Sequence, residues 1–156
     1  MTIEECKLET LDHIEKVRHY IKLCIDKLAT RGIFHDHTKL ESPEVEVFTE
    51  YTPKLATAVY NSPEYKEFLA SMGTALEHHY ANNRHHPEYF EKGIDDMNLI
   101  DIIEMICDWK ASTKRTANGN LLTSIEHNAK RFNINDQLKN ILVNTAKLFD
   151  DIDHLG

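Results

Sequence analysis

Apolar residues recur at helical spacing along most of the chain, and they do not alternate at a period of two over any useful length. The pattern predicts a long helix over residues 3–30, ending before Gly32, and a later helix over about 98–115. Two further helices are predicted near 120–132 and 135–150. The apolar stripe of the first helix consists of Ile14, Val17, Ile21, Cys24 and Leu28. The chain is therefore predicted to be all-α.

Prolines divide the middle of the chain. A short helix is expected over residues 35–40. Ser42-Pro43, Thr52-Pro53 and Ser62-Pro63 each place an N-cap residue before a proline suited to a first helical turn. The third pair is predicted to open a helix that reaches about residue 80. One face of that helix carries Tyr65, Phe68, Leu69, Met72, Leu76 and His79. A polar loop follows over 82–93, with a helical turn near 87–90.

Length and composition favour one globular domain over residues 1–156. No apolar run is long enough to cross a bilayer, and the N-terminal segment lacks the pattern of a secretory signal, so we expect a cytoplasmic protein without a membrane partner. The helices of about 120–150 have apolar faces. These faces either complete the core or pair with another subunit in a homo-oligomer.

Charge restricts the class of partner. The formal net charge is −8, which disfavours binding to extended nucleic acid. A small anionic substrate stays compatible, because a metal ion and a few cations can reverse the local potential. The chain has ten histidines, and six of them fall in three short stretches. This clustering is the first indication of a metal site.

The adjacent pair His35-Asp36 is the first candidate. An imidazole and a carboxylate suit Mn, Fe, Co, Zn or Ni. His13 is a candidate third ligand from the first helix. Asp108 lies in a strongly apolar helix, where a carboxylate must be solvated, paired or metal-bound. Because Asp101, Glu104 and Asp108 share one helical face, a solvated acidic face is the alternative.

In this order, His13, His35-Asp36 and Asp108 resemble the H…HD…D signature of the HD superfamily of metal-dependent phosphohydrolases. The resemblance covers about residues 10–115 and implies a helical bundle of HD type, with His13, His35, Asp36 and Asp108 on one ion. His35 to Lys39 is similar to the family's HDxxK element. Lys39 stands where some members carry a glutamate that assists the attacking water, so here we expect it to neutralise a phosphate oxygen.

Two histidine pairs extend the resemblance to the binuclear branch of that superfamily. His79 continues the apolar stripe of its helix and is the stronger ligand candidate, whereas His78 points about a quarter turn away. Binuclear members have a further histidine between the HD pair and this segment, and none lies between His37 and His78. Either His85 or His86 fills that position in a second metal or substrate site, or the site is mononuclear.

The whole chain also resembles an HD-related family found in bacteria and their phages. The motifs are HDxxKLE, YTPKL, HHYANNRHHPE and CDWKA, in that order. This resemblance implies the fold and the metal site more than it implies a reaction.

The function expected from these residues is metal-dependent hydrolysis of a phosphate ester in a small anionic substrate, most simply a nucleotide. One or two divalent ions (Mn, Co, Fe, Ni, Zn or Mg) are the expected cofactor, and Asp36 and Lys39 are the expected catalytic residues. Arg84, Lys110 and Arg115 are candidates for binding the phosphate, and Asn82 and Asn83 for a sugar or base. Two alternatives stay open: a binuclear iron oxygenase of HD type, and a non-catalytic, metal-stabilised nucleotide-binding protein.

Overall fold

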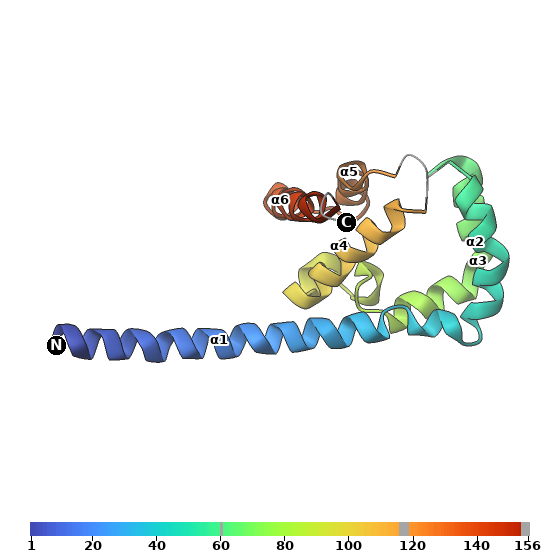
Figure 1. Ribbon diagram of the computed structural model, residues 1–156. Helices are drawn as coiled ribbons and strands as arrows, with labels where there is room; N and C mark the ends of the chain where they lie inside the picture. Colours follow the sequence, from blue (N-terminus) through green and yellow to red (C-terminus); the bar gives the residue numbers. More distant parts are fainter. Residues whose placement is uncertain (60, 116–118, 154–156) are drawn as a thin grey trace. The chain divides into compact units, whose positions relative to one another are not determined.

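The computed structural model describes residues 1–59, 61–115 and 119–153, with the side chains of 150–153 excepted. Within these ranges the chain is helical and contains no strand, which confirms the predicted all-α class (Figure 1). The α-helices are α1 (Ile3–Phe34), α2 (Glu44–Thr57), α3 (Pro63–Asn82), α4 (Leu99–Thr113), α5 (Leu121–Arg131) and α6 (Asp136–Asp153). Three short 3-10 helices are η1 (His37–Leu40), η2 (Pro87–Tyr89) and η3 (Gly93–Asp96). None of the described helices combines the length and apolarity needed to cross a bilayer.

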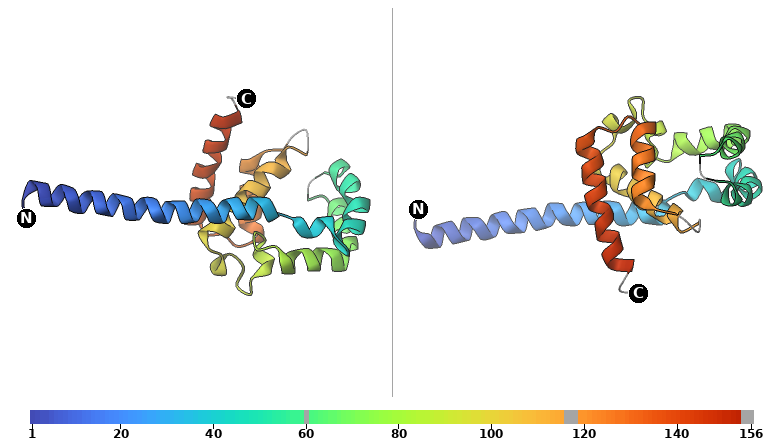
Figure 2. Two further views of the ribbon diagram at one scale, coloured as in Figure 1. Left: turned by 60° about the horizontal axis from the view of Figure 1, so that its bottom comes forward. Right: turned by 90° about the horizontal axis from the view of Figure 1, so that it is seen from above.

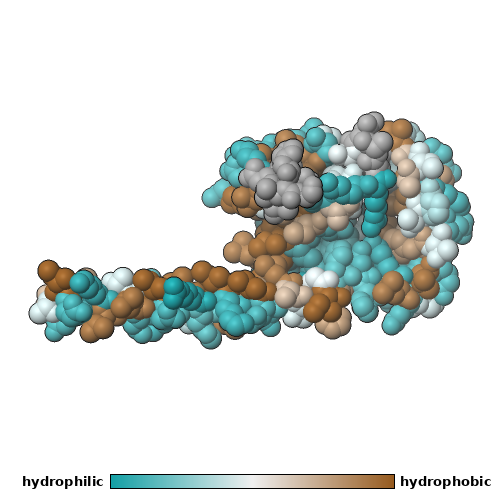
Figure 3. Space-filling view, viewed as in Figure 1, coloured by the Kyte–Doolittle hydropathy of each residue, from teal (hydrophilic) through white to brown (hydrophobic). Residues whose placement is uncertain are grey.

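The chain divides into two units, residues Met1–His35 and Asp36–Gly156. The first unit is α1. A capping box begins this helix: the Thr2 hydroxyl accepts from the Glu5 N–H at 3.2 Å, and the Glu5 carboxylate accepts from the Thr2 N–H at 2.6 Å. Apolar side chains lie along the length of α1 (Figure 3), as the helical spacing predicts. The expectation of a single domain stays a prediction.

The core of the second unit lies among α4, α5 and α6. Helices α5 and α6 lie side by side, joined by a short connection (Figure 2). The buried apolar residues of this core are Ile106, Leu121, Ile125, Ala129, Ile134, Leu142 and Ala146. The helices after Asn120 therefore complete the core. Pairing of this chain with a second copy stays a prediction.

Helices α2 and α3 lie side by side in the second unit (Figure 2). Ser62 caps α3 as predicted, its hydroxyl accepting from the Tyr65 N–H at 3.1 Å. The other two proline signals are wrong as N-caps: Pro43 itself occupies the cap position of α2 without a side-chain bond, and Pro53 lies inside that helix. An interior proline costs about 3 kcal/mol. We attribute the tolerance of Pro53 within α2 to the packing of that helix against α3, which offsets this cost.

Helix α3 is interrupted at Gly73, whose φ of +42° and ψ of −116° are not helical. Residues with a side chain rarely adopt a positive φ, so the glycine permits this break. On either side of the break the predicted apolar face is buried at Met72 and His79. The break therefore leaves the inward direction of His79 intact.

Candidate metal centre

Asp36 is held in a left-handed backbone conformation just before η1, with φ of 55° and ψ of 19°. This region is uncommon for residues other than glycine, although aspartate tolerates it better than most. The Lys39 N–H closes the turn onto the Asp36 carbonyl at 2.9 Å. In the side chain, Oδ2 accepts from the Lys39 ammonium at 2.6 Å. One carboxylate oxygen is thereby engaged by a cation, and Oδ1 is directed toward a group of imidazoles.

His79 approaches Asp36 from the last turns of α3. The residue is buried, with an exposed fraction of 1%. Its Nε2 lies 3.4 Å from Asp36 Oδ1, and its ring meets that of Phe48 edge to face at 5.6 Å. The prediction that His79 faces inward, made from the apolar stripe, is confirmed.

His85 and His86 come from the loop that follows α3. This loop is fixed to α4 by Arg84, whose Nε and Nη2 donate to the two carboxylate oxygens of Asp101 at 3.1 and 3.0 Å. The guanidinium also lies over the ring of Phe90, 4.8 Å from its centroid. Asp101 is fully buried. A bidentate pair of this kind restricts the loop in both position and orientation.

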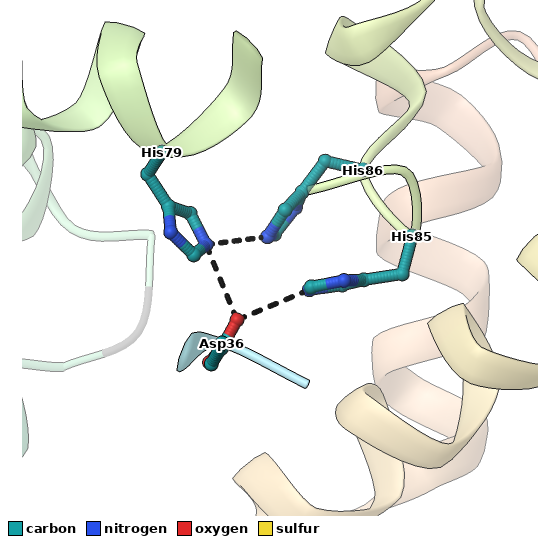
Figure 4. Close-up of side chains that lie close together, drawn as sticks. All are labelled: Asp36, His79, His85 and His86. Carbon is teal, nitrogen blue, oxygen red and sulfur yellow. Dashed lines mark hydrogen bonds and ion pairs between the residues drawn. The ribbon is translucent and has the colours of Figure 1, made fainter. Parts of the chain in front are cut away.

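Three imidazole nitrogens and one carboxylate oxygen converge in this place (Figure 4). Besides the His79 contact, Asp36 Oδ1 lies 3.4 Å from His85 Nε2, and His79 Nε2 lies 2.9 Å from His86 Nε2. Donors bonded at about 2.1 Å to one ion lie about 3.0 Å apart at right angles and about 3.4 Å apart in a tetrahedron. The three separations of 3.4, 3.4 and 2.9 Å lie close to these values, as expected for ligands that share one ion.

Two buried carboxylates contact the same imidazoles from the outside. The Nδ1 of His79 lies 2.8 Å from Glu44 Oε2, and the Nδ1 of His85 lies 3.2 Å from Glu104 Oε1. An imidazole that donates its Nδ1–H outward presents the lone pair of Nε2 inward. Metal-binding histidines commonly have such a carboxylate partner, which fixes the tautomer and the orientation of the ring.

The electrostatics of the group favour neutral imidazoles. Burial lowers the pKa of His86 to about 3, and the charges of His85 and His79 act in the same direction. Burial, followed by the positive charge of Lys39, also lowers the pKa of His79, against the opposing effects of Asp36 and Glu44. Only the neutral ring binds a metal. The residues present therefore fit a divalent transition ion, for which imidazole nitrogen is a preferred ligand.

Residues 2–148 match the model of a family of unknown function (DUF5662). The chain belongs to this family. No curated protein and no solved structure matches it. The matched range includes every candidate site residue from His13 to Arg115, so the members of DUF5662 are the proteins in which the centre should be sought.

The four converging residues comprise two predicted metal ligands and two candidates for a second metal or substrate site. Asp36 and His79 were predicted metal ligands, and His85 and His86 were assigned to a second metal or to substrate. His78 does not face this group: its Nδ1 contacts Glu44 Oε1 at 2.7 Å. The mononuclear and binuclear alternatives both stay predictions.

The remaining predicted residues occupy several places. Asp108, on α4, is near enough for its charge to raise the pKa of His86. His13 and His35 belong to the first unit, His35 as the C-cap residue of α1, so their roles as ligands stay predictions. Lys110 lies on α4 and Arg115 is exposed beyond its end. Their roles, and that of Arg84, in binding a phosphate stay predictions too.

Reasoning from sequence missed three contacts of buried carboxylates: Glu44 with His79, Glu104 with His85, and Asp101 with Arg84. Glu44 carries no local signal, since it is one of several glutamates that follow Ser42-Pro43. The alternative of a solvated acidic face is wrong for Asp101 and Glu104, because both residues are buried. The partners of these two carboxylates, Arg84 and His85, lie in a different segment. Asn83 is buried and donates to the His79 carbonyl at 2.8 Å, and its expected contact with a sugar or base stays a prediction.

Proposed function

We propose that this protein binds a divalent transition metal through Asp36, His79, His85 and His86, and that it hydrolyses a phosphate ester in a small anionic substrate such as a nucleotide. One observation carries the proposal. Three imidazoles converge on one carboxylate oxygen while buried glutamates contact the outer nitrogens of two of those imidazoles. Such an arrangement is costly to build, because it buries several polar groups, and a bound cation is what it accommodates best.

The donor set favours particular metals. Three nitrogens and one oxygen suit Mn, Fe, Co, Ni or Zn better than Mg or Ca, which prefer oxygen. With four protein donors, a tetrahedral zinc ion would have no position left for water, as in structural zinc sites. Ions that accept five or six ligands keep a position for reaction. We therefore expect manganese, iron, cobalt or nickel to support activity better than zinc.

Hydrolysis is proposed from the resemblance to the HD superfamily together with the surroundings of the four donors. A metal ion bound there would lower the pKa of a coordinated water toward neutrality and would polarise a phosphoryl oxygen. Lys39 places a cation beside the four donors, with its ammonium 2.6 Å from Asp36 Oδ2 and 4.9 Å from the centroid of the Phe48 ring. From this position Lys39 holds the carboxylate and supplies positive charge for an anionic substrate.

The test combines metal content with phosphate release. Protein loaded with manganese, iron or cobalt is incubated with nucleoside mono-, di- and triphosphates, beside the Asp36→Asn variant. Glu46→Gln, an exposed change on α2, serves as the control. We expect phosphate release by the wild type and the control, and at least a 100-fold loss in Asp36→Asn.

Other outcomes would select the rival functions. Oxygen consumption that depends on iron, without phosphate release, would identify the oxygenase. Tight nucleotide binding without turnover under every metal would identify a binding protein. Either result would refute the proposed phosphate-ester hydrolysis.

A further inference from the structure

Glu44 is a fully buried carboxylate that contacts two successive histidines of α3. Its Oε2 lies 2.8 Å from His79 Nδ1, and its Oε1 lies 2.7 Å from His78 Nδ1. Each oxygen thus faces one imidazole nitrogen. Burying a carboxylate is unfavourable unless donors satisfy it, and here both oxygens have one.

The neighbouring amide decides which nitrogen of His79 carries the proton. The amide nitrogen of Asn83 has two hydrogens and lies 2.9 Å from the Thr38 hydroxyl and 2.8 Å from the His79 carbonyl. Both hydrogens are used by these two acceptors, although the same nitrogen lies 3.1 Å from His79 Nδ1. His79 Nδ1 therefore acts as a donor to Glu44, and the lone pair of Nε2 points toward Asp36 and His86.

His78 differs from His79 in its surroundings. Its side chain is 41% exposed, whereas those of His79 and Glu44 are buried. Of the two imidazoles that contact Glu44, only that of His79 belongs to the group of four converging donors. The contact of His78 with the carboxylate therefore serves to hold Glu44, which in turn holds His79.

We propose that Glu44 is a positioning residue of the metal centre, and that His78 is the second donor that fixes Glu44. This proposal rests on the proposed metal site. Glu44 selects the Nδ1–H tautomer of His79 and fixes the rotation of its ring, so that Nε2 is ready for the ion before the ion arrives. Glu104 stands in the same relation to His85, at 3.2 Å, from α4. The two carboxylates orient two of the three imidazoles from two different helices.

The experiment compares the full chain with Glu44→Gln, which keeps the shape and removes the charge, and with Glu46→Gln as the exposed control on α2. Cobalt(II) affinity is measured by titration of the metal-free proteins, with the visible spectrum recorded at saturation. Loss of an outer carboxylate typically weakens metal binding by about 10–100-fold. We expect a loss of this size in Glu44→Gln, wild-type affinity in Glu46→Gln, and the same saturated spectrum in all three.

A second readout does not need the metal. Nitrogen-15 NMR of the metal-free protein reports which nitrogen of His79 carries hydrogen. We expect the Nδ1–H form in the wild type and a mixture of tautomers in Glu44→Gln. His78→Asn keeps Glu44 but shortens its second donor, and we expect an intermediate loss of cobalt affinity, which provides the test should Glu44→Gln fail to fold.

Several results would overturn the proposal. Unchanged cobalt affinity in Glu44→Gln would do so, and so would an Nε2–H form of His79 in the metal-free wild type. A saturated spectrum that differs from the wild type in Glu44→Gln would make Glu44 a direct ligand. If the wild type binds no cobalt while His79 still depends on Glu44 for its tautomer, the proposed function fails and the tautomer assignment stands.

Discussion

The pair formed by Arg84 and Asp101 gives the sharpest prediction about the second unit. Replacing Arg84 by Met removes the bidentate contacts at 3.1 and 3.0 Å from a fully buried carboxylate. Removing one partner of a buried ion pair costs about 3–5 kcal/mol. Water reaches the arginine side, where the side chain is 39% exposed, so we take the lower end of that range. The expected loss is about 3 kcal/mol in the free energy of unfolding.

Thermal unfolding followed by circular dichroism measures this loss. For a chain of this size, 1 kcal/mol corresponds to roughly 2–4 °C, so the midpoint should fall by about 6–12 °C. Arg131→Met is the matched control, because Arg131 likewise pairs with a carboxylate, that of Glu88 at 2.6 Å, and lies over an aromatic ring, that of Phe132, but in a more exposed place. Exposed pairs contribute less than about 1 kcal/mol, so the control midpoint should barely move.

A double mutant separates the buried charge from other effects of the substitution. In Arg84→Met, the buried carboxylate of Asp101 keeps its charge but loses its two contacts with the guanidinium. Adding Asp101→Asn removes that charge. The double variant should therefore be more stable than the sum of the two single losses predicts. A loss below about 1 kcal/mol in Arg84→Met, or strict additivity in the cycle, would refute the reasoning.

Three further predictions concern pH, the backbone and the metal. Because the pKa of His86 is lowered to about 3, the unfolded chain takes up a proton at a higher pH than the folded chain does. The free energy of unfolding of the metal-free protein, measured with urea, should accordingly fall by about 1–2 kcal/mol between pH 7 and pH 5. The fall should be smaller in His86→Asn. An equal dependence on pH in the two proteins would argue against a lowered pKa of His86. Gly73→Ala should destabilise by about 1–3 kcal/mol through backbone strain alone, since φ is +42° and an added methyl meets nothing within 4 Å; an unchanged thermal midpoint would contradict this. Metal at about 100 times its Kd stabilises the folded protein by about 2.7 kcal/mol, so chelation should lower the thermal midpoint of the metal-loaded wild type by roughly 5–11 °C. Chelation should leave the midpoint of Asp36→Asn unaffected. An equal fall in both proteins would contradict a site at Asp36.

Periodicity predicted the helices well because each one depends on residues close together in sequence. The stripe that ends at His79 also predicted the inward direction of that side chain, and the structure confirms it. Proline signals were less informative. Pro53 lies within α2, which packs against α3, and this tertiary contact is invisible to a local pattern.

The candidate site was only partly predictable for a related reason. Histidine clustering identified the imidazoles, because several histidines in short stretches are unusual. The carboxylates on the outer nitrogens, Glu44 and Glu104, come from α2 and α4, and nothing in their neighbouring residues distinguishes them from surface glutamates. Asp101 likewise looks solvated in sequence until Arg84 is placed beside it.

The most direct test of the metal centre is an anomalous diffraction map from crystals of the cobalt-loaded protein, recorded at the cobalt absorption edge. The account predicts one strong peak at bonding distance, about 2.1 Å, from Asp36 Oδ1 and from the Nε2 atoms of His79, His85 and His86. A peak bonded to other side chains and not to these, or the lack of any peak in crystals saturated with cobalt, would contradict it.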